Sequence, residues 1–352
     1  MSCPDSRTYS GSAIEPCTAR ATGAGGLDTA VSVSYSDNVN AGTAAASATY
    51  AGDSNHLGSS GSATFTIAKA VSTVTVTCAT GPFTYNGAPQ TPCSAKATGA
   101  GGLDTPLTVS YSDNVDAGTA TASAAYAGDA NHLGDSSSQT FTIGKATPTV
   151  SVTWSGWTYD GAAHPATGSV TGVGGASLGS PTFTYYSGGS ASGTPLAGAP
   201  SGVGPFTVVA SFAGNANYLP ASKTKTVSGL YRWDGFLQPI NDTAHQGLFE
   251  SSFKLGSTIP AKFQLKKADG GIVQAGVLPV FSRSTTPVAC DTQIAPEGLD
   301  TDSAFSGSTF RWDATAQQYI YNWSTKGLRA GEYRIYAALD DGSRQYVDIC
   351  LQ

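Results

Sequence analysis

The sequence predicts an all-β protein, in which small antiparallel β-sandwiches follow one another and a further sandwich ends the chain. Three observations support this fold class. Apolar and polar residues alternate along many short segments, the pattern of half-buried strands. Clusters of Gly, Asn, Asp and Pro separate these segments every 8–12 residues or so, as turns require. Residues 8–70 also recur at 84–146, with 45 identities in 63 positions. No segment shows convincing helical periodicity.

The composition limits the possible function. Of the 352 residues, 40% are hydrophobic and 10% aromatic, which is enough to build cores and argues against disorder. Only 12% are charged, about half the usual share, which argues against most enzymes. The net charge of -6 disfavours nucleic acid, which needs a clustered basic surface. No apolar run approaches the roughly 18 residues that a membrane span needs.

The repeat divides the first two thirds of the chain. ATGAGGLDT at 21–29 returns at 97–105, and NHLG at 55–58 returns at 131–134. A diverged third copy follows, in which TYDG at 158–161 matches TYNG at 84–87 and AGNANYL at 213–219 matches AGDANHL at 127–133. About 12 residues are inserted into this copy, and we place them between Ser187 and Pro205. We therefore predict domains at 1–69, 70–145 and 146–228.

The cysteines follow the repeats. None forms a C-x-x-C pair and no His cluster accompanies them, so neither a metal nor any other cofactor is expected. Cys78 shares the apolar face of a strand with Val74 and Val76, and Cys93 follows the next turn. The first copy has the same arrangement. We predict the disulfides Cys3–Cys17 and Cys78–Cys93, in an oxidising compartment.

The third copy replaces this cystine. Trp154 stands where the second copy has Cys78, and Ala166 stands where it has Cys93. A Trp set against an Ala roughly conserves the volume of a cystine, and packed cores tolerate volume-conserving exchanges best.

The repeats resemble a known family. The order of YxG, AGT, YAGDxNHLxxS and TFTIxKA is similar to that of bacterial extracellular immunoglobulin-like repeats, including the MBG type. The resemblance covers residues 1–228. It implies an immunoglobulin-like sandwich fold and a spacer or adhesion role on secreted and surface proteins, and it implies no catalytic residue.

The character of the chain changes near residue 229. Residues 1–228 hold 18 charged side chains and residues 229–352 hold the other 24, so we predict a fourth domain at 229–352. Its Pro260-Ala261-Lys262-Phe263 resembles the P-x-K-F signature of a bacterial surface-protein domain. WDGFLQP at 233–239, VACD at 288–291 and YNWST at 321–325 support the match. The resemblance implies another all-β module and no established chemistry.

Three further features of this domain are predicted from its residues. Segments 334–339 and 345–351 flank a DDGS turn and form a hairpin. Cys290 and Cys350 are the two cysteines left after the repeats, so we pair them. Tyr319, Tyr321 and Trp323 form an aromatic stripe. An aromatic face of Trp312, Tyr319 and Trp323 could stack on sugar rings, although in-register aromatics in strands are more often core.

Two recurring features of the repeats have both a structural and a functional interpretation. His56 and His132 occupy matching positions, but the third copy has Tyr218 there, which favours an aromatic plug over a metal ligand or an acid–base group. The turns at 37–40 and 113–116 are rich in Asp and Asn, which suit calcium but also cap backbone groups. Capping is the preferred interpretation.

The function that these features favour is a non-enzymatic stalk or adhesion segment of a bacterial secreted or cell-surface protein. The alternatives are a carbohydrate-binding module centred on residues 229–352 and a filament subunit that assembles through exposed edge strands. The partner would be a host or environmental glycan or protein, or a second copy. The N-terminus lacks the pattern of a signal peptide, so we expect this chain to be a piece of a longer extracellular protein.

Overall fold

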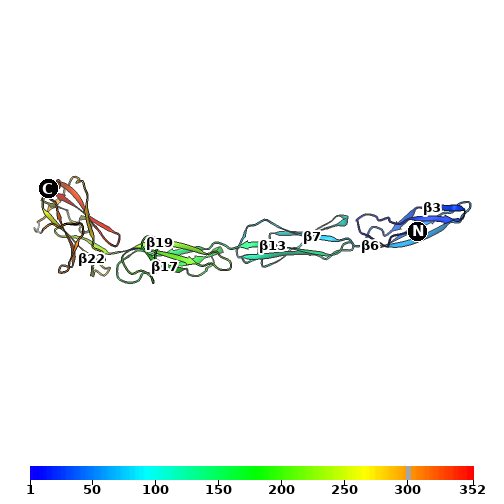
Figure 1. The fold of residues 1–352 in the computed structure, drawn as a ribbon, viewed down its shortest axis with the longest axis horizontal. Helices are drawn as coiled ribbons and strands as arrows, with labels where there is room; N and C mark the ends of the chain where they lie inside the picture. The colour runs from blue at the N-terminus through cyan, green and yellow to red at the C-terminus, as the bar shows by residue number, and fades with distance from the viewer. Residues whose placement is uncertain (299–302) are drawn as a thin grey trace. The chain divides into compact units, whose positions relative to one another are not determined.

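The predicted all-β fold class is confirmed. A computed structural model describes residues 1–298 and 303–352, and the chain forms immunoglobulin-like β-sandwiches in tandem (Figure 1). Two compact units can be distinguished. Unit 1 contains Met1–Ala146 together with Asn215–Leu219, and unit 2 contains Thr147–Gly214 and Pro220–Gln352.

The first sandwich of unit 1 has an unequal pair of sheets. A four-stranded sheet has the order β1-β6-β5-β4, and the other sheet contains only β2 and β3. The outer strand β1 runs parallel to β6, and the other pairs are antiparallel. The strands are β1 (Ser6–Thr8), β2 (Ala19–Gly23), β3 (Leu27–Val31), β4 (Val33–Ser36), β5 (Gly42–Tyr50) and β6 (Ser59–Ala68).

The second sandwich of unit 1 repeats this plan and adds one strand. Its sheets have the orders β11-β12-β13-β8 and β10-β9-β7. Val74 and Val76 of one sheet pack against Ala120 and Phe141 of the other, so the predicted alternation buries the expected face. The strands are β7 (Ser72–Cys78), β8 (Phe83–Thr84), β9 (Cys93–Gly99), β10 (Leu103–Leu107), β11 (Ser110–Ser112), β12 (Gly118–Tyr126) and β13 (Asp135–Gly144).

Unit 2 begins with the third sandwich, whose sheets have the orders β15-β19-β18-β17 and β14-β16. The segment in which the sequence places the insertion joins β17 to β18 as a hairpin loop. Trp154 and Ala166 are both buried in the core that this sandwich forms. The strands are β14 (Thr149–Thr153), β15 (Trp157–Thr158), β16 (Thr167–Thr171), β17 (Thr182–Ser187), β18 (Gly204–Phe212) and β19 (Ala221–Leu230).

The C-terminal part of unit 2 has two five-stranded sheets. One has the order β20-β22-β27-β26 with β23 paired to β22, and the other has the order β24-β28-β29-β21-β25. The predicted hairpin is present as β28 and β29. The strands are β20 (Arg232–Leu237), β21 (Glu250–Phe253), β22 (Thr258–Lys266), β23 (Ile272–Val273), β24 (Val280–Arg283), β25 (Ile294–Pro296), β26 (Arg311–Asp313), β27 (Gln318–Ser324), β28 (Gly331–Ala338) and β29 (Arg344–Leu351).

In the described residues, helical structure is confined to short turns. The α-helix α1 (Thr243–Gln246) could not be predicted, because four residues are too few for a periodic pattern. The Asp242 side chain caps its start and Gly247, with a φ of 63°, ends it. Each repeat also has a 3-10 turn at the end of β2, β9 or β16, namely η1 (Ala24–Gly26), η2 (Ala100–Gly102) and η3 (Val173–Gly175).

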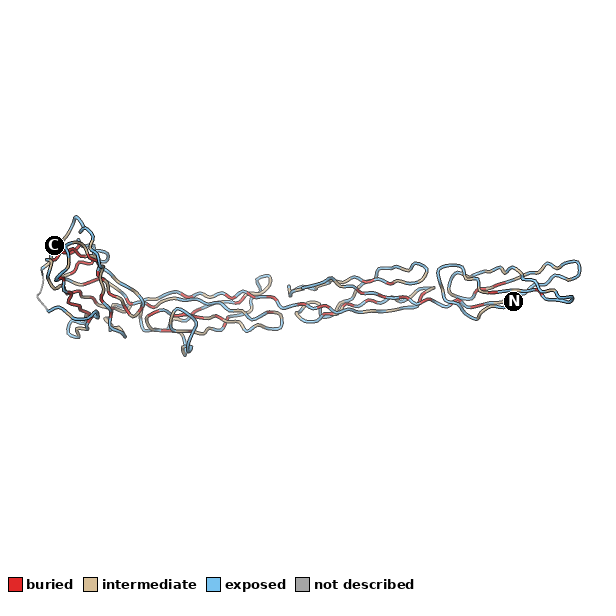
Figure 2. The backbone as a smooth tube through the Cα atoms, turned by 45° about the horizontal axis from the view of Figure 1, so that its top comes forward, coloured by how far each residue is buried: buried red, intermediate tan, exposed pale blue. Residues whose placement is uncertain are grey.

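The cores differ in size. Figure 2 shows buried residues inside every sandwich, and the described residues of the C-terminal domain form the largest cluster. The first sandwich has a small core, built from two alanines, Phe65, Ile67 and Cys17. A small core limits stability, so a covalent link has most to add in this part of the chain.

Each of the three predicted cysteine pairs forms a disulfide. Cys3–Cys17 and Cys78–Cys93 each close a short loop within their sandwich, with sequence separations of 14 and 15. Cys290–Cys350 ties the last strand to the loop that precedes β25. All six cysteines are therefore oxidised, which indicates an extracellular or otherwise oxidising compartment. In the described residues, no helix is long and apolar enough to cross a membrane.

Candidate functional site

The most elaborate recurring arrangement in unit 1 lies at the joint between its two sandwiches. The loop between β12 and β13 carries Asp129, Asn131 and His132, and it contacts the start and the end of the first sandwich. Within residues 1–298 and 303–352, no group of three or more His, Cys, Asp or Glu side chains could hold a metal ion. The joint is therefore the candidate site.

Asn131 is the central hydrogen-bonding residue of this joint. Its Oδ1 accepts from the backbone N–H of Ala41 at 2.9 Å, and its Nδ2 donates to Oδ1 of Asn40 at 3.1 Å. Its carbonyl accepts from the N–H of Ala70, the residue that leads into β7. The Asn131 side chain thus binds a turn of the first sandwich, and the Asn131 backbone binds the segment that leads into β7.

A ring contact completes the joint. The ring of Tyr9 meets His132 edge-on with centroids 5.2 Å apart, and His132 is 5% exposed. Gly11 lies against Gly101, and a Cβ at Gly101 would collide with the Tyr9 hydroxyl. Glycine at Gly101 is required both by this approach and by its φ of 66°.

The His132 imidazole is held at both nitrogens. Nε2 lies 2.9 Å from the carbonyl of Ala100, and Nδ1 lies 2.9 Å from Oδ1 of Asp129. The carbonyl of Ala100 and then the Asp129 carboxylate raise the pKa of His132, although burial opposes them. The Tyr126 hydroxyl, with the N–H of Asn131 and the His132 side chain, lowers the pKa of Asp129. Both charged forms are therefore favoured in the folded state.

A second joint in unit 1 repeats the first. The loop Asn215–Leu219 supplies Asn217, whose Oδ1 accepts from the N–H of Ala117 at 2.9 Å and whose Nδ2 donates to Oδ1 of Asp116 at 2.9 Å. The rings of Tyr85 and Tyr218 meet edge-on with centroids 5.4 Å apart. The hydrogen bonds and ring contact of the first joint are thus reproduced, with Tyr218 in the place of His132.

Unit 2 contains a related contact that uses a different acceptor. Tyr159, which matches Tyr9 and Tyr85, meets the ring of Tyr231 edge-on with centroids 6.0 Å apart. The carbonyl of Tyr159 accepts from the N–H of Ala268 at 2.8 Å. The C-terminal domain thus contacts the equivalent tyrosine, but not through a loop of the kind seen at 131–133 and 217–219.

The turns considered for calcium belong to these joints. Asp37 and Asp113 have φ values of 58° and 55°, a left-handed conformation that Asp tolerates better than most residues. Their neighbours Asn40 and Asp116 accept the hydrogen bonds from the next loop. The side-chain oxygens of Asn40 and Asp116 therefore serve to bind the next loop.

The aromatic stripe of the C-terminal domain lies inside it. Tyr319 is fully buried and Trp323 is 5% exposed, so protein atoms occupy both ring faces. Trp312 is half-buried and packs edge-on against Tyr319 at 4.9 Å. The structure thus places this stripe in the core, because β27 is covered along almost its whole length.

The P-x-K-F tetrad is part of β22 and has a packing role. Phe263 is fully buried between the rings of Phe310 and Tyr319, and Pro260 is buried opposite Asn322 of β27. Lys262 is half-buried and pairs in register with Ile320.

One buried carboxyl in this domain has an unusual environment. Glu250 is 4% exposed, and its Oε2 accepts from the N–H of Asp291 at 3.2 Å. Its Oε1 has no hydrogen-bond partner in the described part of the chain. Burial, with the nearby charges of Glu332 and Asp348, raises the pKa of Glu250 to about 7. No pattern in the sequence predicts this environment of Glu250.

No protein-family model matches this chain, and no curated protein matches it. Similar solved structures include extracellular cadherin domains 3–6 of protocadherin gamma B2, 12% identical over 98% of this chain and 96% of that one, with a TM-score of 0.23. Three N-terminal domains of the outer capsid protein Hoc of bacteriophage RB49 are 13% identical over 92% and 98%, with a TM-score of 0.24. Likeness at this level carries no argument about function.

Proposed function

We propose that this chain is a non-enzymatic stalk or adhesion segment of a bacterial secreted or cell-surface protein, in which the repeats serve as jointed spacers. The observation that carries the proposal is the joint built twice in unit 1. Asn131 makes a pair of side-chain hydrogen bonds to Asn40 and Ala41, and Asn217 makes the same pair to Asp116 and Ala117. A series of sandwiches that needs only to be tethered would require no such contacts.

The bacterial and surface assignments rest on the resemblance of the repeats to MBG-type domains and of Pro260–Phe263 to the P-x-K-F signature. The three disulfides agree with export to an oxidising compartment. The low share of charged residues in the repeats suits a spacer, because little of their surface is arranged for chemistry.

The joint can be tested with two glycine variants. Gly101 and Gly25 occupy matching turns with φ values of 66° and 68°, so alanine strains both equally. Only Gly101 contacts a neighbouring sandwich, through Tyr9, whereas a Cβ at Gly25 would meet nothing within 4 Å. Gly101→Ala should therefore loosen the joint, and Gly25→Ala should not.

The measurement is the set of backbone residual dipolar couplings of the two sandwiches in the full chain. In the wild type and in Gly25→Ala, one alignment tensor should fit both sandwiches. Gly101→Ala should require two tensors. If Gly101→Ala still fits one tensor, or if the wild type already needs two, the joint does not fix the sandwiches and the spacer proposal loses its support.

A further inference from the structure

His132 connects the two parts of the second sandwich that meet the first sandwich. One part is the loop between β12 and β13, whose Asn131 side chain binds a turn of the first sandwich. The other part is the turn η2, in which Gly101 lies against Tyr9. His132 belongs to the loop, and its Nε2 lies 2.9 Å from the carbonyl of Ala100 in η2. The imidazole therefore holds the loop against the turn.

Both ring nitrogens of His132 face groups that act as hydrogen-bond acceptors. Nε2 faces the carbonyl of Ala100, and Nδ1 lies 2.9 Å and 3.0 Å from the two carboxylate oxygens of Asp129. The protonated imidazole has a donor on each nitrogen, whereas the neutral ring has only one. Because His132 is 5% exposed, an acceptor that loses its donor is left unsatisfied at a cost in free energy.

The acceptor that loses its donor is the carbonyl of Ala100. The surroundings of Asp129 lower the pKa of its carboxyl, so it stays ionised. A hydrogen bond to a charged acceptor is roughly twice as strong as one to a neutral acceptor, so the neutral ring keeps its proton on Nδ1. Its Nε2 then turns a lone pair toward the oxygen of Ala100, and the contact between the loop and η2 becomes repulsive.

We propose that His132 makes the first joint of unit 1 sensitive to pH. The protonated ring holds the loop and η2 together against the first sandwich, and loss of its proton releases η2 and loosens the joint. This inference rests on the proposed spacer function and adds regulation to it. The second joint has Tyr218 in place of His132, so it carries no imidazole that could respond. Unit 1 would thus gain one flexible joint as the pH rises.

The direction of the response follows from the surroundings of the ring. The carbonyl of Ala100 raises the pKa of His132, burial opposes this effect, and the carboxylate of Asp129 raises the pKa further. The pKa in the folded chain therefore lies above the ordinary value of about 6.5. The joint is held at acidic pH and is released as the pH rises through the folded value.

His132 is the group in this cluster that suits such a switch. Besides Asp129, the titratable side chains packed around the ring and its carboxylate are Tyr9, Tyr126 and Lys69. Among these kinds of side chain, only histidine ordinarily changes its charge between about pH 5 and 8.

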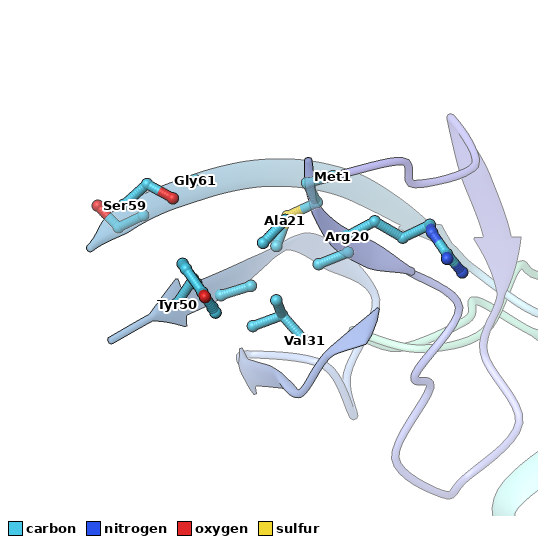
Figure 3. A pocket seen from close by; sticks show the side chains of 10 residues that line it. Met1, Arg20, Ala21, Val31, Tyr50, Ser59 and Gly61 are labelled. Atoms are coloured by element: carbon cyan, nitrogen blue, oxygen red, sulfur yellow. The ribbon is translucent and has the colours of Figure 1, made fainter. Parts of the chain in front are cut away.

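Two other features of the first sandwich lie apart from this joint. His56 makes the matching pair of contacts within its own repeat. Figure 3 shows a groove between Ala21, Val31 and Tyr50, with a volume of about 150 Å³. Among the described residues, none that lines this groove belongs to the first joint. Variants at His132 therefore leave both features in place.

Two substitutions that copy the third repeat test separate parts of the argument. His132→Tyr copies Tyr218 and removes the imidazole. Asp129→Asn copies Asn215, whose Oδ1 accepts from the N–H groups of Asn217 and Tyr218 as Oδ1 of Asp129 does from the matching N–H groups. This variant keeps the loop but removes the charge beside the imidazole, so it should lower the pKa of His132.

The measurement is the set of backbone residual dipolar couplings of the two sandwiches in the full chain, recorded from pH 5.5 to pH 9. The glycine comparison belongs at pH 5.5, where the joint is held. The wild type should fit one alignment tensor at pH 5.5 and need two at pH 9, and the change should follow the proton shift of the His132 ring. Asp129→Asn should change at a lower pH, and His132→Tyr should fit one tensor throughout.

The outcomes separate this inference from the spacer function. A wild type that fits one tensor over the whole range would overturn the pH response and leave the spacer function standing. Two tensors already at pH 5.5 would contradict the spacer function itself. A change with pH that persists in His132→Tyr would assign the response to another group and overturn the inference. If His132→Tyr needs two tensors at every pH, Asp129→Asn decides, and an unchanged midpoint in that variant would overturn the inference.

Discussion

The Cys78–Cys93 disulfide offers a quantitative test of how the repeats are stabilised. It closes a loop of 15 residues, so the chain-entropy relation gives a contribution of about 3 kcal/mol at 25 °C. Replacing both cysteines with alanine should lower the stability of the second sandwich by that amount. For a domain of this size, the loss corresponds to a fall of roughly 12–24 °C in its unfolding temperature.

The third sandwich supplies the rescuing variant. There the Trp154 indole donates to the carbonyl of His164 at 2.8 Å, and the Tyr185 hydroxyl accepts from the N–H of Ala166 at 2.8 Å. Tyr111 makes the same hydrogen bond to the N–H of Cys93. Because the supporting tyrosine is common to both, Cys78→Trp with Cys93→Ala should recover part of the loss by filling the volume of the cystine.

Scanning calorimetry of the full chain can resolve the transition. The matching double alanine variant at Cys3 and Cys17 identifies which transition belongs to the first sandwich. If the Cys78/Cys93 alanine variant unfolds within about 4 °C of the wild type, the stabilisation is under about 1 kcal/mol, and the loop-entropy argument fails for this fold.

The Glu250 carboxyl and the His132 imidazole each predict a loss of stability as the pH rises. The raised pKa of Glu250, about 7 against an ordinary 4.5, means that its contribution is complete below pH 4.5 and is lost as the pH rises to 7. The loss is at most about 3 kcal/mol. Urea unfolding at pH 5 and pH 8 should show this loss in the wild type and little of it in Glu250→Gln; equal losses would contradict the assignment. The pKa of His132 is also raised, so its stabilisation is present below its ordinary pKa of about 6.5 and disappears as the pH rises through the folded value. His132→Tyr, which copies the second joint and leaves His56 in place, should remove this part of the pH dependence of calorimetric unfolding between pH 6 and 8.5; an unchanged profile would contradict it.

The strands could be predicted because their signal is local. Alternation at Val74 and Val76 reports which face is buried, and the turn at 340–343 reports where β28 meets β29. The repeat strengthens this prediction, because the same error in assigning the buried face would have to occur in both copies. The exchange of a cystine for Trp154 and Ala166 was visible for the same reason.

The joint could not be predicted, because recurrence alone does not say what a residue contacts. Tyr9 and His132 both recur, yet each lies in a turn of its own repeat, and nothing in the pattern places one on the other. The oxygens of Asn40 and Asp116 likewise suited a cation or a cap, and the preference for a cap did not identify the group that they bind. Only the structure shows that they accept hydrogen bonds from Asn131 and Asn217.

The aromatic stripe shows a different limit of sequence patterns. Alternation at Tyr319, Tyr321 and Trp323 predicts that these rings share one face of a strand, but not whether that face is covered. In β27 the intervening residues are also buried, because both faces of the strand are packed. A strand that is buried on both faces belongs to the interior of a domain, which argues against the sugar-binding interpretation.

In each joint the tyrosine is held in the same way, whereas the aromatic residue that it contacts varies. The N–H of each tyrosine donates to a carbonyl at the end of the last strand of its own repeat, at Ala68, Gly144 and Leu230, over 2.7–2.9 Å. Each ring is thus positioned by its own sandwich, whatever follows. The acceptors can then differ, and they do: His132, Tyr218 and Tyr231. A repeat with such a joint can precede any domain that places one aromatic ring at this point, which explains how similar repeats and an unrelated C-terminal domain can share a chain.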